Sequence, residues 1–297
     1  MAGLSLSRAA VATLSVLSLG AALPTRQEAA LANASALVVF GDSYTDNGNA
    51  YALTNDTWPA DPAYFQGRFS NGPVWSEQLA QQKSLTLHDY AYASATTSNR
   101  ISKGTTGSNA DIRVPSLDEQ VERYLARLPA PASQSILVLW GGTNDPLFNS
   151  TIAPQASAQV MRGLVHRLKS VSPAGMLIIG IPDLSLLPYG YFIDAEEQDR
   201  LHAFSVEYNI ELSRIAKQAG AKYVDVSSLL QSFEYYGKGW QGVGLDAFGF
   251  YGSCLEGAYM EAPKRKCEDP EKRVYWDEYH VTRRVHELFA EKIAEVL

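Results

Sequence analysis

Cysteine is scarce in this chain, since Cys254 and Cys267 are the two cysteines among its 297 residues. Two thiolates are too few for a structural zinc site, and no CxxC pair stands near them. In an oxidising compartment, two cysteines this close together most simply form one disulfide that closes a local loop. We therefore expect a Cys254–Cys267 disulfide rather than two free thiols.

Charge of one sign is not concentrated anywhere in the chain. The formal net charge is -7 at pH 7, and no long acidic or basic block occurs. A nucleic-acid-binding protein would need a stripe of lysine and arginine, so we expect no nucleic-acid partner. Beyond the N-terminal region no apolar run reaches the length of a membrane span. We therefore expect a mature protein without stable membrane insertion.

The N-terminal region has the pattern of a secretory signal peptide. Met1–Arg8 is weakly basic, and Ala9–Leu23 is an apolar stretch that is short for a membrane span. Small residues suited to signal cleavage stand at Gly20–Ala22 and at Ala30–Ala32. The alternatives are an uncleaved anchor and a disordered tail.

Three glycosylation sequons agree with secretion, although such tripeptides often occur by chance. They begin at Asn33, Asn55 and Asn149. We expect residues 1–32 to contain the signal peptide and an N-terminal segment. Residues 33–297 would then form a single secreted domain, which we expect to be a monomer.

Apolar runs alternate with amphipathic segments along the rest of the chain. Runs typical of buried strands are Ala36–Phe40, Ser135–Trp140, Met176–Ile181 and Lys222–Val226. Helices are predicted over Val74–Gln82, Leu117–Leu128, Gln155–Ser170, Asp194–Gln218 and His280–Leu297. Strands of continuous apolar character separated by helices predict an α/β fold, with a mostly parallel sheet covered on both faces.

Polar residues cluster where two of these strands end. The first strand runs into FGDS (residues 40–43), and the second runs into WGGTND (residues 140–145). Ligands of open parallel sheets bind beyond the carboxyl ends of the strands, so both groups should face one crevice. Glycine, aspartate, serine and asparagine also favour ordinary turns, so the first stretch alone does not establish a site.

A third segment supplies the partners that a serine nucleophile needs. Asp277 and His280 stand three positions apart, a spacing that can hold both side chains on one side of a turn. His280 would take the proton of Ser43, and Asp277 would orient the imidazole. Asn144 and backbone N–H groups near Ser43 would stabilise the oxyanion. The alternatives are a turn serine, a turn-capping asparagine and a helix-capping aspartate.

These blocks, in this order, resemble the GDSL (or SGNH) lipases and acylhydrolases. Gly41–Asn49 is similar to the first block of that family, Gly142–Asp145 to its GxND block and Asp277–His280 to its DxxH block. The intervening Gly67–Trp75 is similar to a branch that includes secreted microbial members. The resemblance implies a flavodoxin-like, three-layer α/β/α sandwich around a five-stranded sheet. It also implies ester hydrolysis without a metal or an organic cofactor.

The chain departs from the family at the block that normally offers a glycine N–H to the oxyanion. Asp89–Thr97 stands there, with Ala93 and Ser94 where glycines are usual. The N–H of Ser94 would remain as a donor, but a Cβ at a positive φ would cost about 1–2 kcal/mol. Val281 replaces the proline that usually follows the histidine, and we expect little effect from that change.

We therefore expect a secreted serine esterase that acts on short-acyl (acetyl) esters of carbohydrates or on lipid esters. The lack of a long apolar lid segment favours the short acyl group. One alternative is a binding protein whose oxyanion hole is spoiled at Ala93 and Ser94, and another is a metal-dependent hydrolase built around Asp42, Asp46 and the histidines. Several aromatic residues, Tyr64 among them, could line a groove or pack loops, and we assign none of them to binding.

Overall fold

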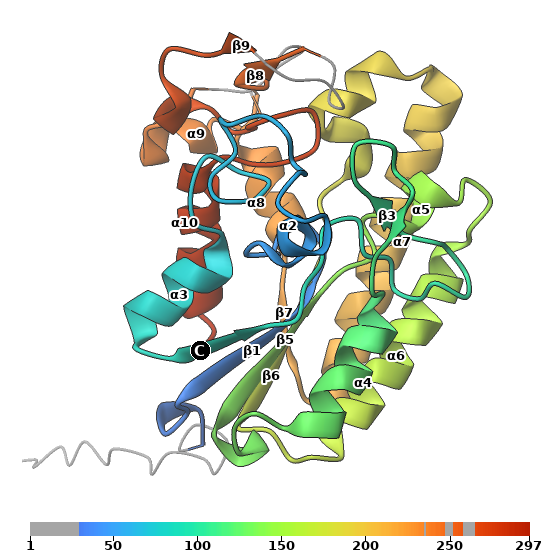
Figure 1. Cartoon of the computed structure of the whole chain (residues 1–297), viewed down its shortest axis with the longest axis vertical. Coiled ribbons are helices and arrows are strands. Elements are labelled where there is room, and N and C mark those ends of the chain that lie inside the picture. The colour runs from blue at the N-terminus through green and yellow to red at the C-terminus, as the bar shows by residue number, and fades with distance from the viewer. Residues whose placement is uncertain (1–29, 235, 247–251, 258–264) are drawn as a thin grey trace, which may run out of the picture.

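A five-stranded parallel sheet forms the centre of the fold (Figure 1). The computed structural model describes residues 30–234, 236–246, 252–257 and 265–297. In spatial order the strands are β2 (Thr86–Asp89), β1 (Ala36–Gly41), β5 (Ser135–Trp140), β6 (Gly175–Ile179) and β7 (Lys222–Val224). Every neighbouring pair is parallel. The predicted α/β class with a mostly parallel, five-stranded sheet is confirmed.

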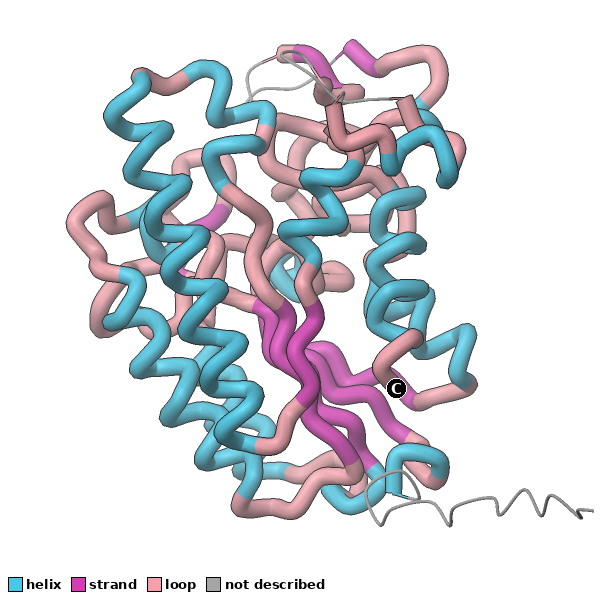
Figure 2. The backbone as a smooth tube through the Cα atoms, turned by 180° about the vertical axis from the view of Figure 1, so that it is seen from behind, coloured by secondary structure: helices cyan, strands magenta, loops and turns pink. Residues whose placement is uncertain are grey.

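Helices cover both faces of this sheet, as the continuous apolar strands predict (Figure 2). On one face lie α3 (Trp75–Lys83) and α10 (Arg283–Ala294), which pack side by side. On the other face lie α4 (Leu117–Arg127), α6 (Pro154–Lys169) and α7 (Ala195–Ala219). All residues of β1 and β5 are buried between the two layers, and they form the middle of the hydrophobic core.

Short elements connect these layers. The short helices are α2 (Asn49–Leu53), α5 (Asp145–Phe148), α8 (Val226–Ser232) and α9 (Gly239–Val243). Two-stranded ladders join β3 (Thr105–Thr106) to β4 (Ile112–Arg113) and β8 (Leu255–Glu256) to β9 (Arg265–Lys266). Turns of 3₁₀ helix are η1 (Ala132–Gln134), η2 (Leu184–Leu186), η3 (Pro188–Phe192) and η4 (Pro270–Lys272). Helices α2 and α5 follow directly from the polar segments after β1 and β5.

Strand β2 is the one strand of the central sheet that hydrophobic patterning did not predict. Its four residues include His88 and Asp89, and none of the four is fully buried. As an edge strand it is hydrogen-bonded to β1 on one side, and its residues are exposed or only partly buried, so no unbroken apolar run marks it. At the opposite edge β7 ends at Val224, two residues earlier than predicted, because Asp225 caps α8 by accepting the N–H of Ser228 at 3.0 Å.

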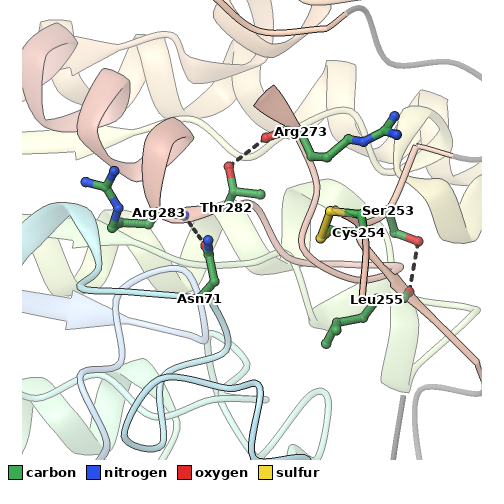
Figure 3. The surroundings of a disulfide bond; sticks show 8 residues. Asn71, Ser253, Cys254, Leu255, Arg273, Thr282 and Arg283 are labelled. Carbon is green, nitrogen blue, oxygen red and sulfur yellow. Dashed lines mark hydrogen bonds between the residues drawn. A yellow bond between two sulfur atoms is a disulfide. The ribbon is translucent and has the colours of Figure 1, made fainter. Parts of the chain in front are cut away.

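The last helix begins at Arg283, and the prediction that it begins at His280 was wrong. The backbone from Trp276 to His280 forms a tight turn instead, in which the Trp276 N–H donates to the carbonyl oxygen of His280 at 2.7 Å. At the true start, the Arg283 N–H donates to Asn71 Oδ1 at 2.6 Å (Figure 3). Partners distant in sequence therefore set this boundary, and local helical spacing does not reveal them.

The predicted disulfide between Cys254 and Cys267 is present (Figure 3). Cys254 is fully buried, and its N–H donates to the carbonyl oxygen of Tyr275 at 3.0 Å. The N–H of the next residue, Leu255, donates to the carbonyl oxygen of Trp276 at 2.7 Å. The disulfide-closed segment is thus hydrogen-bonded to the backbone immediately before Asp277.

The predicted signal peptide lies outside the described residues, apart from residues 30–32. Within the ranges that are described, no helix combines the length and the apolar character needed to cross a membrane. The sequon residues Asn33 and Asn55 are exposed, whereas Asn149 donates through Nδ2 to the carbonyl oxygen of Ile101 at 2.9 Å. Use of the sequons stays a prediction.

Candidate active site

Ser43 lies in a tight turn at the carboxyl end of β1. The N–H groups of Thr45 and Asp46 donate to the carbonyl oxygen of Asp42 at 2.9 Å, and the N–H of Tyr44 donates to the Asp42 carboxylate at 3.1 Å. These bonds close the turn directly after the strand. Ser43 retains 8% of its exposure and lines a cavity at this edge of the sheet.

The structure brings His280 and Asp277 to the same place. His280 Nε2 lies 2.9 Å from Ser43 Oγ, although the two residues are 237 positions apart. On the other side of the ring, His280 Nδ1 lies 2.9 and 2.8 Å from the two carboxylate oxygens of Asp277. The N–H groups of Tyr279 and His280 both donate to Asp277 Oδ1 at 2.8 Å, and so they fix the carboxylate within its own turn.

The charged states of the titratable side chains at this site depend on burial and on the hydrogen bonds and charges near each group. Burial opposes the charge on Asp277, but the neighbouring His280 and several hydrogen bonds hold the pKa of Asp277 below its usual value. Burial raises the pKa of Asp42 to about 7, despite the Tyr44 N–H that donates to it. On α10, burial and then the nearby His280 lower the pKa of His286 to about 3. Asp277 is therefore the ionised partner of His280 near neutral pH.

Asn144 and Ser94 line the same cavity as Ser43 and His280. The Asn144 side chain is oriented by a hydrogen bond from Nδ2 to the carbonyl oxygen of Ala95 at 3.0 Å, which leaves a second amide hydrogen for another acceptor. Ser94 has a φ of 68°, the left-handed conformation that the family's glycine would adopt without cost. Position 94 thus has the positive φ that was considered from the sequence, and a residue with a Cβ adopts it at a cost of about 1–2 kcal/mol.

Asp46 connects the turn that carries Ser43 to the segment that carries Ser94. Its buried carboxylate accepts the N–H of Ala93 at 2.7 Å, and also the N–H groups of Gly48, Asn49 and Ala50 at 2.6 to 3.0 Å. Burial raises the pKa of Asp46 to about 6, and the Ala93 N–H is the largest opposing influence. The carboxylate thus holds the start of α2 and the Ala93–Ser94 peptide in one arrangement.

The cavity has a volume of about 230 Å³. Its polar side carries Ser43, Ser94, Asn144 and His280. Its remaining lining residues are Tyr44, Ala93, Thr143, Leu147, Phe148, Leu187, Tyr189 and Tyr279. The Ser43 hydroxyl, the His280 imidazole and the Asn144 amide therefore line one small space together with aromatic and aliphatic side chains.

The GDSL-like Lipase/Acylhydrolase family model matches residues 37–293 of the chain. The chain belongs to this family. The resemblance drawn from the three sequence blocks is thereby confirmed.

Relatives of this GDSL-family chain include the thermolabile hemolysin of Vibrio parahaemolyticus, which is 27% identical over 279 residues, or 87% of this chain and 63% of that protein. Another is the secreted effector protein SseJ of Salmonella typhimurium, 27% identical over 282 residues, or 90% of this chain and 64% of that protein. The chain therefore spans somewhat less than two thirds of either relative. Phospholipase A1 from Streptomyces albidoflavus has a similar fold, with a TM-score of 0.51, 15% identity, and coverage of 88% of this chain and 99% of that chain.

Two supporting residues of this GDSL-family site were not assigned a role from the sequence. Asp46 stood in the first block, but its buried contact with Ala93 is formed by a segment 47 positions away. Tyr64 donates its hydroxyl proton to Asp277 Oδ2 at 2.6 Å across 213 positions. An acidic residue within the block that contains Ser43 was a weak signal for Asp46, whereas no local pattern pointed to Tyr64.

The described residues offer no group of ligands for the metal site that one alternative requires. Across the described part of the chain, no three His, Cys, Asp or Glu side chains are placed to hold one ion. Asp42 and Asp46 instead accept backbone N–H groups within the first turn. Their local role is to shape the chain around Ser43.

Proposed function

We propose that this GDSL-family protein hydrolyses carboxylic esters through an acyl-serine intermediate. The proposal rests on one observation above the others, the unbroken row of hydrogen-bond distances from Ser43 through His280 to Asp277 beside the cavity. An alcohol, an imidazole and a carboxylate in that order are what a serine nucleophile requires near neutral pH. The chemistry is complete without a metal or an organic cofactor.

The reaction proceeds in two halves. Ser43 Oγ attacks the ester carbonyl carbon while His280 Nε2 takes the hydroxyl proton, and Asp277 stabilises the imidazolium. The charge on the former carbonyl oxygen is stabilised by the N–H groups of Ser43 and Ser94 and by the Asn144 amide. The imidazolium then protonates the leaving alkoxide, and the alcohol departs. Water attacks the acyl-serine with His280 as base, which releases the acid and restores the serine.

The cavity favours a short acyl group. Its volume of about 230 Å³ is below the roughly 300–1,000 Å³ of pockets that enclose drug-sized ligands. We therefore place acetyl esters of carbohydrates first. Lipid esters are the second candidate, because Phe148 lines the cavity and is 40% exposed, so a longer chain could leave over its ring.

The protein is proposed to act outside the cytosol as a monomer. A disulfide is typical of oxidising compartments, and one relative of the chain is named as a secreted effector protein. The N-terminal pattern described above supports the same destination.

The test compares Ser43→Ala with the wild-type protein on p-nitrophenyl esters from acetate to palmitate and on acetylated sugars. We expect kcat/KM to fall by at least about a thousandfold. Ser76→Ala is the matched control, because Ser76 is fully buried on α3 and its hydroxyl has no hydrogen-bond partner among the described residues. It should retain wild-type turnover.

Three outcomes would contradict the proposal. Equal rates for Ser43→Ala and the wild type would exclude the serine mechanism. Loss of activity on dialysis against a chelator would favour the metal-dependent alternative. A wild-type protein that binds acetylated sugars or lipids without turning over any ester would favour the binding protein.

A further inference from the structure

Tyr64 makes a direct contact with the carboxylate of the Ser43–His280–Asp277 row. Its hydroxyl donates to Asp277 Oδ2 at 2.6 Å, and the Tyr64 side chain is buried with 7% exposure. The distance is short for a neutral donor, and hydrogen bonds to a carboxylate are roughly twice as strong as neutral ones. A buried phenol is therefore hydrogen-bonded to the Asp277 carboxylate.

The Tyr64 ring is held in place by packing rather than by this bond alone. It belongs to a small hydrophobic cluster of Ala50, Trp58, Tyr64, Phe69, Ala93, Cys254, Leu255 and Trp276. The centroid of its ring lies 5.9 Å from that of Phe69 and 6.4 Å from that of Trp276. Phe69 in turn lies 5.0 Å from the His280 ring. A phenylalanine at position 64 would keep these contacts and lose only the hydroxyl.

We propose that Tyr64 is a positioning residue that tunes the triad, because its hydroxyl draws charge from Asp277 and so limits how tightly His280 holds its proton. This inference rests on the proposed ester hydrolysis. The hydrogen bond also restrains Asp277 Oδ2, so that both carboxylate oxygens stay within hydrogen-bond distance of His280 Nδ1. Tyr64 acts through Asp277 and is not among the described residues that line the cavity.

The direction of the effect follows from electrostatics. A carboxylate that accepts a hydrogen bond from a phenol presents less negative charge to the imidazole than a carboxylate without that donor. Removing the phenol hydroxyl concentrates charge on Asp277, so His280 should keep its proton to a higher pH. The neutral His280 that activates Ser43 would then form only at a higher pH than in the wild type.

Other titratable groups also face this pair. Asp42, after β1, and His286, on α10, face His280, which lowers the pKa of both. Tyr44, in the turn of Ser43, and Tyr279, beside His280, face Asp277, which raises the pKa of both. None of them is changed when position 64 is varied. A change in the pH profile can therefore be assigned to the Tyr64 hydroxyl.

The experiment measures kcat/KM of Tyr64→Phe and wild type for p-nitrophenyl acetate between pH 4.5 and 9. We expect the midpoint of the acid limb to rise by about half to one pH unit, with a plateau within about tenfold of wild type. A purely structural role would lower the whole profile without moving its acid limb. An unmoved midpoint would overturn the inference.

Tyr208→Phe is the matched control, because the buried hydroxyl of Tyr208 donates to the carbonyl oxygen of Gly141 at 3.0 Å rather than to Asp277. Its midpoint should stay at the wild-type value. If Tyr64→Phe does not fold, a fluorinated tyrosine at position 64 replaces it. This residue has the same shape and is a stronger donor, so the midpoint should move to lower pH.

An NMR titration of the His280 ring separates this inference from the proposed function, since it needs no turnover. In Tyr64→Phe the His280 ring should lose its proton at a higher pH than in wild type, by the same amount as the kinetic midpoint. If the wild-type protein hydrolyses no ester but its His280 titration differs from that of Tyr64→Phe, the proposed function is refuted and the Tyr64–His280 coupling stands. If the enzyme is active but His280 titrates at the same pH in wild type and in Tyr64→Phe, the coupling alone is refuted.

Discussion

Replacing Gly104 by alanine should disturb the proposed oxyanion hole from outside the cavity. An ideal Cβ on Gly104 would lie 2.3 Å from the carbonyl oxygen of Ser94, a backbone atom, whereas ordinary contact begins near 3.4 Å. The Ser94 backbone must therefore move by about 1 Å, or Gly104 must move by the same amount.

The expected consequence is a loss of turnover with little change in binding. Removing one oxyanion donor costs about 10²–10³ in kcat, and a 1 Å misplacement of a catalytic group costs about 10². We expect kcat of Gly104→Ala to fall by about a hundredfold, and KM to change by less than about threefold. Steady-state kinetics on p-nitrophenyl acetate at pH 8 measures both quantities.

Gly163→Ala is the matched control. Gly163 lies within α6, and an ideal Cβ on it meets nothing within 4 Å. Alanine should stabilise that helix by about 1 kcal/mol and leave kcat unchanged. The reasoning is refuted if Gly104→Ala keeps kcat within about twofold of wild type, or if its loss is matched by Gly163→Ala.

Two further predictions concern stability. The backbone N–H of Trp75 donates to His286 Nδ1 at 3.3 Å. The pKa of His286 is about 3 in the folded state and 6.5 in the unfolded state, so the unfolded state takes up the proton first as the pH falls, and stability falls with it. His286→Asn keeps an acceptor but does not titrate. Between pH 6.5 and 4.5 its free energy of unfolding, measured by urea titration, should therefore fall less steeply than that of wild type, by up to about 1.4 kcal/mol per pH unit. Equal slopes for the two proteins would contradict this. Replacing Cys254 and Cys267 together by alanine should lower the free energy of unfolding by about 2–4 kcal/mol and the Tm by about 5–10 °C; an unchanged Tm in calorimetry would show that the disulfide does not stabilise the fold.

Hydrophobic patterning was enough to predict the centre of the fold. Strands β1 and β5 lie in the middle of the sheet with both faces covered, so burial on two sides appears in the sequence as an unbroken apolar run. Strand β2 lies at an edge and has no fully buried residue, so it leaves no such run. The start of α10 is set by Asn71, 212 positions away, so local spacing placed it too early.

The place of the site also follows from the sequence, because parallel neighbours end at the same edge. Ser43 follows β1 and Asn144 follows β5, and the two strands pair in register along their whole length. Parallel pairing of these two strands as neighbours brings both polar segments together. The pairing of Asp277 with His280 is likewise local, since one turn contains both residues.

The support of that site was decided by the tertiary structure alone. The carboxylate of Asp46 meets the Ala93 N–H, and the hydroxyl of Tyr64 meets Asp277, only after separate segments have packed. A hydrogen bond needs a distance near 2.8 Å and a direction, and neither leaves a periodic trace in the chain. The left-handed backbone of Ser94 runs against the residue's own preference, so surrounding contacts must impose it. The sequence alone determines which chemical groups are available and at which edge of the sheet they gather, whereas packing between distant segments decides how firmly they are aligned.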